Sequence, residues 1–199
     1  MRSHSTRGFS LIEMMIVIAV SMIIIAIGYM SLNPALQSAH VGNAYNITLS
    51  AIRQARDFAI AQRQQYKVVF SNAATPNTIT ITQNGNGHVV ATYQLPTDVK
   101  FTTLAGMPTA ANAVPDGFGA GGTAIDFDQN IASGAKDTIL FMPDGTAQDK
   151  DGNVNNGVIY VAMTNDIYFS RAITVWGATG RIRGWRLYKK GATAYWRQS

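Results

Sequence analysis

The chain has 199 residues, contains no cysteine and carries a formal net charge of +5, with charged residues making up 14% of it. The lack of cysteine excludes disulfides and thiolate metal sites. The length suffices for one soluble domain of about 130–160 residues beside one membrane helix.

A long apolar segment follows a short polar leader. Residues 1–8 contain two arginines, and residues 9–30 are almost entirely apolar. About 20 such residues, at a rise of about 1.5 Å each, cross the hydrocarbon core of a bilayer as one helix. Glu13, the single glutamate of the chain, lies near the start of this run. A carboxylate is costly inside a membrane helix, so its presence indicates a function. We predict a membrane-spanning helix over residues 9–32.

A second helical segment is predicted over residues 33–65. Asn33 suits a helix N-cap, and Pro34 suits a first helical position. Between residues 41 and 59, apolar side chains recur at steps of three and four, which is typical of an amphipathic helix. A kink is expected between residues 28 and 34.

Beyond residue 65 the apolar period changes to two, and turn residues separate the segments, which predicts a series of strands. The predicted strands are 66–71, 78–83, 88–95, 124–127, 138–142, 157–163 and 172–176. The stretch 105–122, rich in Gly, Ala and Pro, is expected to form a long irregular loop.

The N-terminal residues 7–13, with the sequence RGFSLIE, resemble the prepilin signature of type IV pilins and type II secretion pseudopilins. The resemblance implies that a prepilin peptidase removes residues 1–8 by cleaving between Gly8 and Phe9, and that the new amine of Phe9 is methylated. It also implies that the carboxylate of Glu13 pairs with this amine in a neighbouring subunit during assembly. The alternative is a single-pass anchor in which the glutamate is incidental.

Residues 139–145, 157–161, 173–175 and 180–183 resemble the GspH/FimT branch of this family, which contains minor pilins of the FimT/FimU kind and pseudopilin H of type II secretion. The resemblance implies an α+β, pilin-like fold: a long N-terminal helix, with its first half in the membrane or the filament core, packed on an antiparallel β-sheet or β-sandwich head over residues 66–199. It also implies a single-pass protein of the bacterial inner membrane with a periplasmic head. The implied partners are other pilin or pseudopilin subunits, the prepilin peptidase and the inner-membrane assembly platform.

The C-terminal segment is strongly basic, since seven lysines and arginines and no acidic residue follow Asp166. The sequence GRIR at residues 180–183 matches an element that is associated with DNA binding in the FimT lineage. Alternation along a strand would place Arg181 and Arg183 on one face, and a bulge at Gly184 would re-aim the following arginine. The candidate DNA-binding residues are Arg181, Arg183, Arg186, Lys189 and Lys190.

Three other interpretations of these cations stay open. Lysine and arginine protect an exposed edge strand from aggregation. The same side chains could instead contact acidic neighbours in a filament or the surface of a membrane.

No pattern typical of a catalytic, metal or cofactor site is found. His40 and His88 are isolated, and Asp126 and Asp128 have no base paired with them in the sequence. Residues 149–153 resemble the start of a calcium loop without its closing glutamate, so a polar turn is the alternative. We therefore expect a non-enzymatic minor pilin or pseudopilin that helps to assemble a filament, with DNA binding as an added activity. The alternative is pseudopilin H of a type II secretion system, which contacts other pseudopilins and secreted protein.

Overall fold

The computed structural model describes residues 9–119, 122–128, 136–164, 166–191 and 193–199. Gly8, the expected −1 residue of the cleavage site, lies outside the described residues. Contacts divide the chain into two compact units, Met1–Gln37 and Ser38–Ser199. One long helix, α1 (Leu11–Gln62), contributes to both units and includes Pro34. The kink expected near this proline stays a prediction.

The start of α1 is fixed by two polar residues. The Ser10 hydroxyl oxygen accepts a hydrogen bond from the Glu13 backbone N–H at 3.2 Å. A serine followed three residues later by a glutamate is the sequence of a capping box, and a carboxylate in the first turn also interacts favourably with the helix dipole. Glu13 thus lies where a negative charge favours this helix terminus, in addition to the role that the prepilin resemblance implies.

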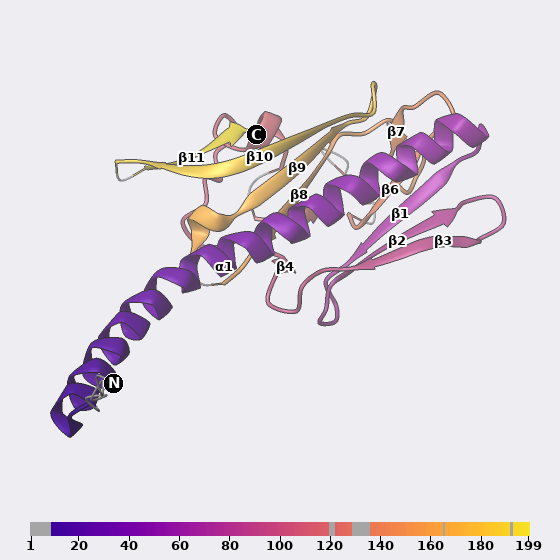
Figure 1. Cartoon of the computed structure of the whole chain (residues 1–199). Coiled ribbons are helices and arrows are strands. Elements are labelled where there is room, and N and C mark those ends of the chain that lie inside the picture. The colour runs from indigo at the N-terminus through magenta and orange to yellow at the C-terminus, as the bar shows by residue number, and fades with distance from the viewer. Residues whose placement is uncertain (1–8, 120–121, 129–135, 165, 192) are drawn as a thin grey trace. The chain divides into compact units, whose positions relative to one another are not determined.

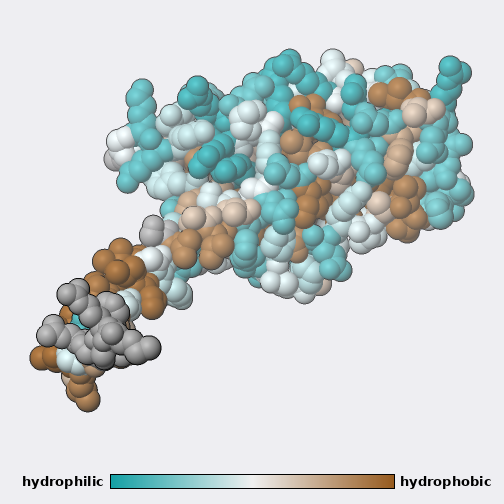
Figure 2. Space-filling model, in the orientation of Figure 1, coloured by the Kyte–Doolittle hydropathy of each residue, from teal (hydrophilic) through white to brown (hydrophobic). Residues whose placement is uncertain are grey.

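The first part of α1 exposes its apolar side chains. Between Phe9 and Leu36, the exposed large hydrophobic residues have exposed fractions of 50–79%, and Figure 2 shows hydrophobic side chains gathered around this segment. The Ser21 hydroxyl donates to the Val17 carbonyl at 2.7 Å, so it is satisfied within the helix. Among the described residues, α1 is the one helix that is long and apolar enough to cross a membrane.

The second part of α1 packs on the strands of the head (Figure 1), so the predicted amphipathic face is confirmed. The helix presents fully or almost fully buried, mostly small side chains to the core: Val41, Ala44, Thr48, Ala51, Ile52, Ala55 and Ala59. It ends at Gln62, three residues before the expected end. There, Arg63 has a φ of 52° and the Gln64 N–H donates to the Ala59 carbonyl at 3.2 Å, as in a Schellman termination.

The strands of the described residues form two sheets, and every pairing between these strands is antiparallel. The first sheet has the order β3 (Val89–Gln94), β2 (Thr78–Gln83), β1 (Tyr66–Ser71), β6 (Thr138–Phe141) and β7 (Ala147–Gln148). The second sheet has the order β11 (Thr193–Gln198), β10 (Arg181–Lys190), β9 (Arg171–Trp176), β8 (Gly157–Ala162) and β4 (Lys100–Phe101), and β5 (Ile125–Asp126) also pairs with β8.

Two hydrophobic cores follow from this arrangement. The larger core lies between α1 and both sheets, and includes Phe70 of β1 and Ile173 of β9. The smaller core contains side chains of the alternate positions of the second sheet, such as Leu187 and Trp196, together with Met107 and Phe118. The described part of loop 105–122 is therefore packed against the sheet through its apolar residues. It contains a short 3₁₀ helix, η1 (Pro115–Gly117).

All seven predicted strands are present, and 66–71 and 78–83 have the predicted bounds. The prediction of a bulge at Gly184 is wrong, because the register between β9 and β10 is continuous from Arg181 to Arg186. Gly184 instead admits Tyr45 of α1: a Cβ atom at residue 184 would lie 1.6 Å from the Tyr45 hydroxyl oxygen. The strand needs glycine here for space rather than for a change of register.

Candidate functional sites

The N-terminal candidate site consists of Phe9 and Glu13. Phe9 is 74% exposed, and Glu13 occupies the first turn of α1 beside the capping residue Ser10. After the implied cleavage, Phe9 would carry a positive amine four residues from the Glu13 carboxylate. Glu13 can therefore act locally, on its own helix terminus, or between subunits, as a counter-charge to such an amine.

The glycine of the GRIR element has a backbone role. Gly180 has a φ of 58°, and a Cβ atom there would lie 1.9 Å from the Gly145 carbonyl oxygen. Arg56 of α1 holds the same turn, since its guanidinium donates to the carbonyls of Gly145 at 3.2 Å and Thr179 at 3.3 Å. Glycine is thus required because the backbone is left-handed and tightly packed at this point.

Arg181 is exposed at the end of this turn. It lines a shallow polar cleft between α1 and the β9–β10 turn, together with Arg53, Arg56 and Asp57. Its neighbourhood therefore includes two further arginines and one carboxylate. Of the two arginines in the GRIR element, Arg181 is the one presented to solvent.

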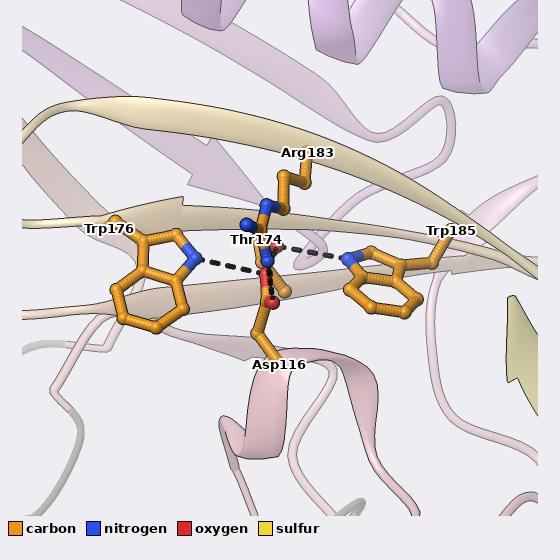
Figure 3. Close-up of polar contacts among 5 residues, drawn as sticks. All are labelled: Asp116, Thr174, Trp176, Arg183 and Trp185. Carbon is orange, nitrogen blue, oxygen red and sulfur yellow. Dashed lines mark hydrogen bonds and ion pairs between the residues drawn. The ribbon is translucent and has the colours of Figure 1, made fainter. Parts of the chain in front are cut away.

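Arg183 is held by a carboxylate from loop 105–122 (Figure 3). The Arg183 guanidinium donates from Nη1 to Asp116 Oδ1 at 2.5 Å, and the side chains are 22% and 5% exposed, respectively. The guanidinium also lies 5.6 Å from the centre of the Trp176 ring, within the range of a cation–π contact. Arg183 therefore already has an anionic partner within its own chain.

Asp116 joins several elements of the head in one polar cluster (Figure 3). Its second oxygen accepts from the Thr174 hydroxyl at 2.6 Å and from the Trp176 indole N–H at 3.0 Å. The Trp185 indole N–H donates to the same Thr174 hydroxyl oxygen at 3.0 Å. Asp116 has a φ of 53°, in the left-handed region that aspartate tolerates better than most residues. Its charge thus ties loop 105–122 to β9 and β10.

The five candidate DNA-binding residues fall on two faces of β10, because the strand alternates without a bulge. Arg181, Arg183 and Lys189 share the face that carries Leu187 and the smaller core. Arg186 and Lys190 share the opposite face with Ile182, which packs against the larger core. The shared face expected for Arg181 and Arg183 is confirmed, whereas the five candidate residues together do not form one surface.

Aromatic rings accompany the cations on both faces. The Lys189 ammonium lies 5.7 Å from the centre of the Tyr168 ring. The Arg186 guanidinium lies 5.3 Å from the centre of the Tyr188 ring, which stacks on Tyr195 at 6.0 Å. Cations beside aromatic rings are compatible with nucleic-acid binding, and equally with packing at the sheet surface.

The possible calcium loop forms a polar turn. The Asp149 carboxylate accepts hydrogen bonds from the backbone N–H groups of Asp151 and Asn153, both at 2.9 Å, and from the Asn155 amide at 3.2 Å. Burial is the largest single influence on the pKa of Asp149, and it raises this pKa by opposing ionisation. The hydrogen bonds together outweigh burial, so the pKa of Asp149 is lowered. Within the described residues, no three His, Cys, Asp or Glu side chains are grouped so as to hold a metal ion.

Comparison with known proteins finds a motif in the N-terminal segment and one similar structure. The family of the prokaryotic N-terminal methylation motif matches residues 3–29. The chain is also similar to the crystal structure of the type IV minor pilin FimU of Pseudomonas aeruginosa strain PAO1, with 12% identity and a TM-score of 0.46 over 77% of this chain and 91% of that one. No curated protein sequence matches the chain. The chain thus carries a prokaryotic N-terminal methylation motif, and this motif leads into a long helix whose second part packs on antiparallel sheets.

Proposed function

We propose that the protein is a minor pilin of the FimT/FimU kind, a structural subunit that helps to assemble a type IV pilus-type filament. Prepilin peptidase cleaves between Gly8 and Phe9, and the new amine is methylated. Residues 9–32 anchor the subunit in the bacterial inner membrane and later lie in the filament core, while the amphipathic helix 33–65 and the head 66–199 lie in the periplasm. The inner-membrane assembly platform and other pilins are its partners.

The observation that supports this proposal best is the uncovered apolar helix directly behind the methylation motif. Large apolar side chains from Phe9 to Leu36 are at least half exposed. A contiguous apolar surface of this kind needs a membrane or partner helices to cover it. A filament subunit uses both in turn, because the same segment leaves the bilayer and packs against the helices of its neighbours.

The test separates the two roles of Glu13. Glutamine can still act at the third position of a capping box but carries no charge, whereas alanine lacks both properties. We expect Glu13→Gln and Glu13→Ala both to insert into the membrane and both to be poorly incorporated into filaments, measured by immunoblotting of sheared filament fractions. Normal incorporation of Glu13→Gln beside a defect of Glu13→Ala would show that Glu13 acts only as a cap, and would refute the counter-charge role.

DNA binding through the basic C-terminal segment is a second, added activity that we propose. It is favoured by the seven cations that follow Asp166 without any acidic residue, of which Arg181, Lys189, Lys190 and Arg197 are exposed. Phosphate contacts of this kind give dissociation constants of about 10⁻⁴–10⁻⁶ M without sequence preference, and a log–log salt slope of about −0.9 for each phosphate neutralised.

The DNA experiment is fluorescence anisotropy of the full chain in neutral detergent micelles, with labelled duplex DNA across a salt series. Two double variants each remove one face: Arg181→Gln with Lys189→Gln, and Arg186→Gln with Lys190→Gln. Removing both cations from the face that contacts DNA should lower the magnitude of the log–log salt slope of DNA binding by about 1.8. The proposed activity would be contradicted if the wild type did not bind DNA at low salt, or if neither double variant changed the binding.

Pseudopilin H of a type II secretion system is the alternative role, since residues 7–13 resemble the signature of pilins and of type II secretion pseudopilins alike. Deletion of the gene distinguishes them. Loss of surface filaments with normal protein export supports the minor pilin role. Loss of export with normal filaments would instead assign the protein to the secretion system.

A further inference from the structure

Three arginines form a row across the second sheet. Arg171 of β9 lies directly opposite Arg186 of β10, and Arg186 lies directly opposite Arg197 of β11. Residues that are directly opposite in antiparallel strands point to the same face, with their Cβ atoms about 4.5–5.5 Å apart. The row Arg171–Arg186–Arg197 therefore projects three guanidinium groups from one side of the sheet, the side of α1 and the larger core.

The row has no carboxylate partner in the part of the chain that the structure describes. The ion pairs found there involve His40, Lys136 and Arg183 instead. Arg171 is only 9% exposed, and its Nη1 donates to the Phe169 carbonyl at 3.0 Å. The Nε of Arg186 is buried and lacks a hydrogen-bond partner among the described residues.

This arrangement is unfavourable for the protein alone. Like charges directly opposite in a sheet destabilise it, and a buried charge is costly unless it is paired. Burial first, and the neighbouring Arg186 second, lower the pKa of Arg171, although an arginine remains charged at neutral pH. An anion between the guanidinium groups would remove both penalties.

Two tyrosines complete the site. The phenol groups of Tyr45 and Tyr188 lie near Arg171. The Tyr45 hydroxyl reaches the sheet through the space left by Gly184, and lies 3.3 Å from the Ser199 hydroxyl. Guanidinium groups and hydroxyls are the donors that oxyanions accept from most readily.

We propose that the row Arg171–Arg186–Arg197, with the hydroxyls of Tyr45 and Tyr188, binds a small oxyanion of the phosphate class. Phosphate suits the row better than a carboxylate does, because it carries up to two charges and presents acceptor oxygens in three dimensions. A carboxylate has one charge and two oxygens in one plane. The bound oxyanion is a structural counter-ion of the head.

The test compares thermal unfolding of the full chain in neutral detergent micelles in inorganic phosphate and in chloride of equal ionic strength. Phosphate should raise the midpoint temperature of unfolding above the value measured in chloride. Above its dissociation constant, each tenfold increase in phosphate should raise the apparent folding equilibrium constant about tenfold. No midpoint difference between phosphate and chloride would overturn the proposal.

Variants assign the effect to the row. Arg186→Gln should lose the phosphate response while unfolding at a higher temperature than the wild type in chloride, because the repulsion is relieved. Arg181→Gln, which lies outside the row on the opposite face, should keep the full response. An unchanged response in Arg186→Gln would overturn the proposal.

A second variant keeps the test decisive should Arg186→Gln fail to fold. Arg197 is an exposed residue of the edge strand, so Arg197→Gln should fold and should bind phosphate several-fold more weakly, measured by ³¹P line broadening. Unchanged broadening in Arg197→Gln would also overturn the proposal. A third outcome is that the protein binds an oligonucleotide but no free phosphate, and that Arg197→Gln weakens the oligonucleotide binding. This outcome would assign the row to nucleic acid and overturn a site for a small oxyanion.

Discussion

Replacing Asp116 by alanine should destabilise the head strongly, although the residue lies in a loop. The substitution removes the acceptor of three hydrogen bonds and leaves the Arg183 guanidinium and the Trp176 indole N–H without their partner. Breaking a buried ion pair by removing one partner costs about 3–5 kcal/mol. Because the Arg183 side chain is 22% exposed, water can replace part of the lost interaction, and we expect about 2–4 kcal/mol.

The assay is thermal and urea unfolding of the full chain in detergent micelles, followed by tryptophan fluorescence, since Trp176 and Trp185 lie in the cluster. The midpoint should fall by about 5–15 °C for a chain of this size. Asp151→Ala is the matched control, because this exposed carboxylate belongs to another loop and its loss should change stability by less than about 0.5 kcal/mol.

A double-mutant cycle tests the ion pair itself. Asp116→Asn and Arg183→Gln should each destabilise the protein, and the double variant should lose about 1–3 kcal/mol less than the sum of the single losses. A coupling energy near zero would show that Asp116 holds the loop through Thr174 and Trp176 alone. A loss for Asp116→Ala no larger than that of Asp151→Ala would refute the whole cluster as a stabilising element.

Three further predictions concern other parts of the chain. Gly184→Ala should destabilise the head by about 1–3 kcal/mol, because its methyl group would overlap the Tyr45 hydroxyl, and Tyr45→Leu should restore part of the loss in chemical denaturation. Asp149 has a lowered pKa in the folded state, so its contribution to stability is complete above the unfolded-state pKa of about 3.9 and is lost as the pH falls through the lower folded-state value. The stability difference between wild type and Asp149→Asn should therefore shrink below about pH 4, and a constant difference down to pH 2 would contradict this account. Gly8→Arg should accumulate as the unprocessed precursor on immunoblots, and a band of mature size would refute the cleavage site.

The long helix and the first two strands could be predicted because their signals are local. Apolar residues at helical spacing define α1, and strict alternation between turn residues defines β1 and β2. The end of α1 was missed because the left-handed conformation of Arg63 carries no glycine or asparagine to mark it. The cap at Ser10 is also a local signal, because a serine stands three residues before a glutamate at the start of the apolar run.

The pairing of Asp116 with Arg183 could not be predicted, because 67 residues separate them and the loop that carries Asp116 has no periodic pattern. The row Arg171–Arg186–Arg197 was equally hidden. It depends on the registers of β9, β10 and β11, and β11 was not predicted as a strand. A shift of one residue in either register would send its arginines to opposite faces.

The GRIR element illustrates how a motif match and a packing requirement can coincide. Gly180 is needed for its left-handed backbone and its approach to Gly145, Ile182 is needed by the larger core, and Arg183 neutralises Asp116. Three of the four residues therefore have a structural reason to be there, and only Arg181 is left to contact a ligand without loss of an internal partner. If the element acts in DNA binding, Arg181→Gln should weaken the binding and leave unfolding unchanged. Arg183→Gln should lower the unfolding midpoint, and the variant that remains folded should retain most of the DNA affinity.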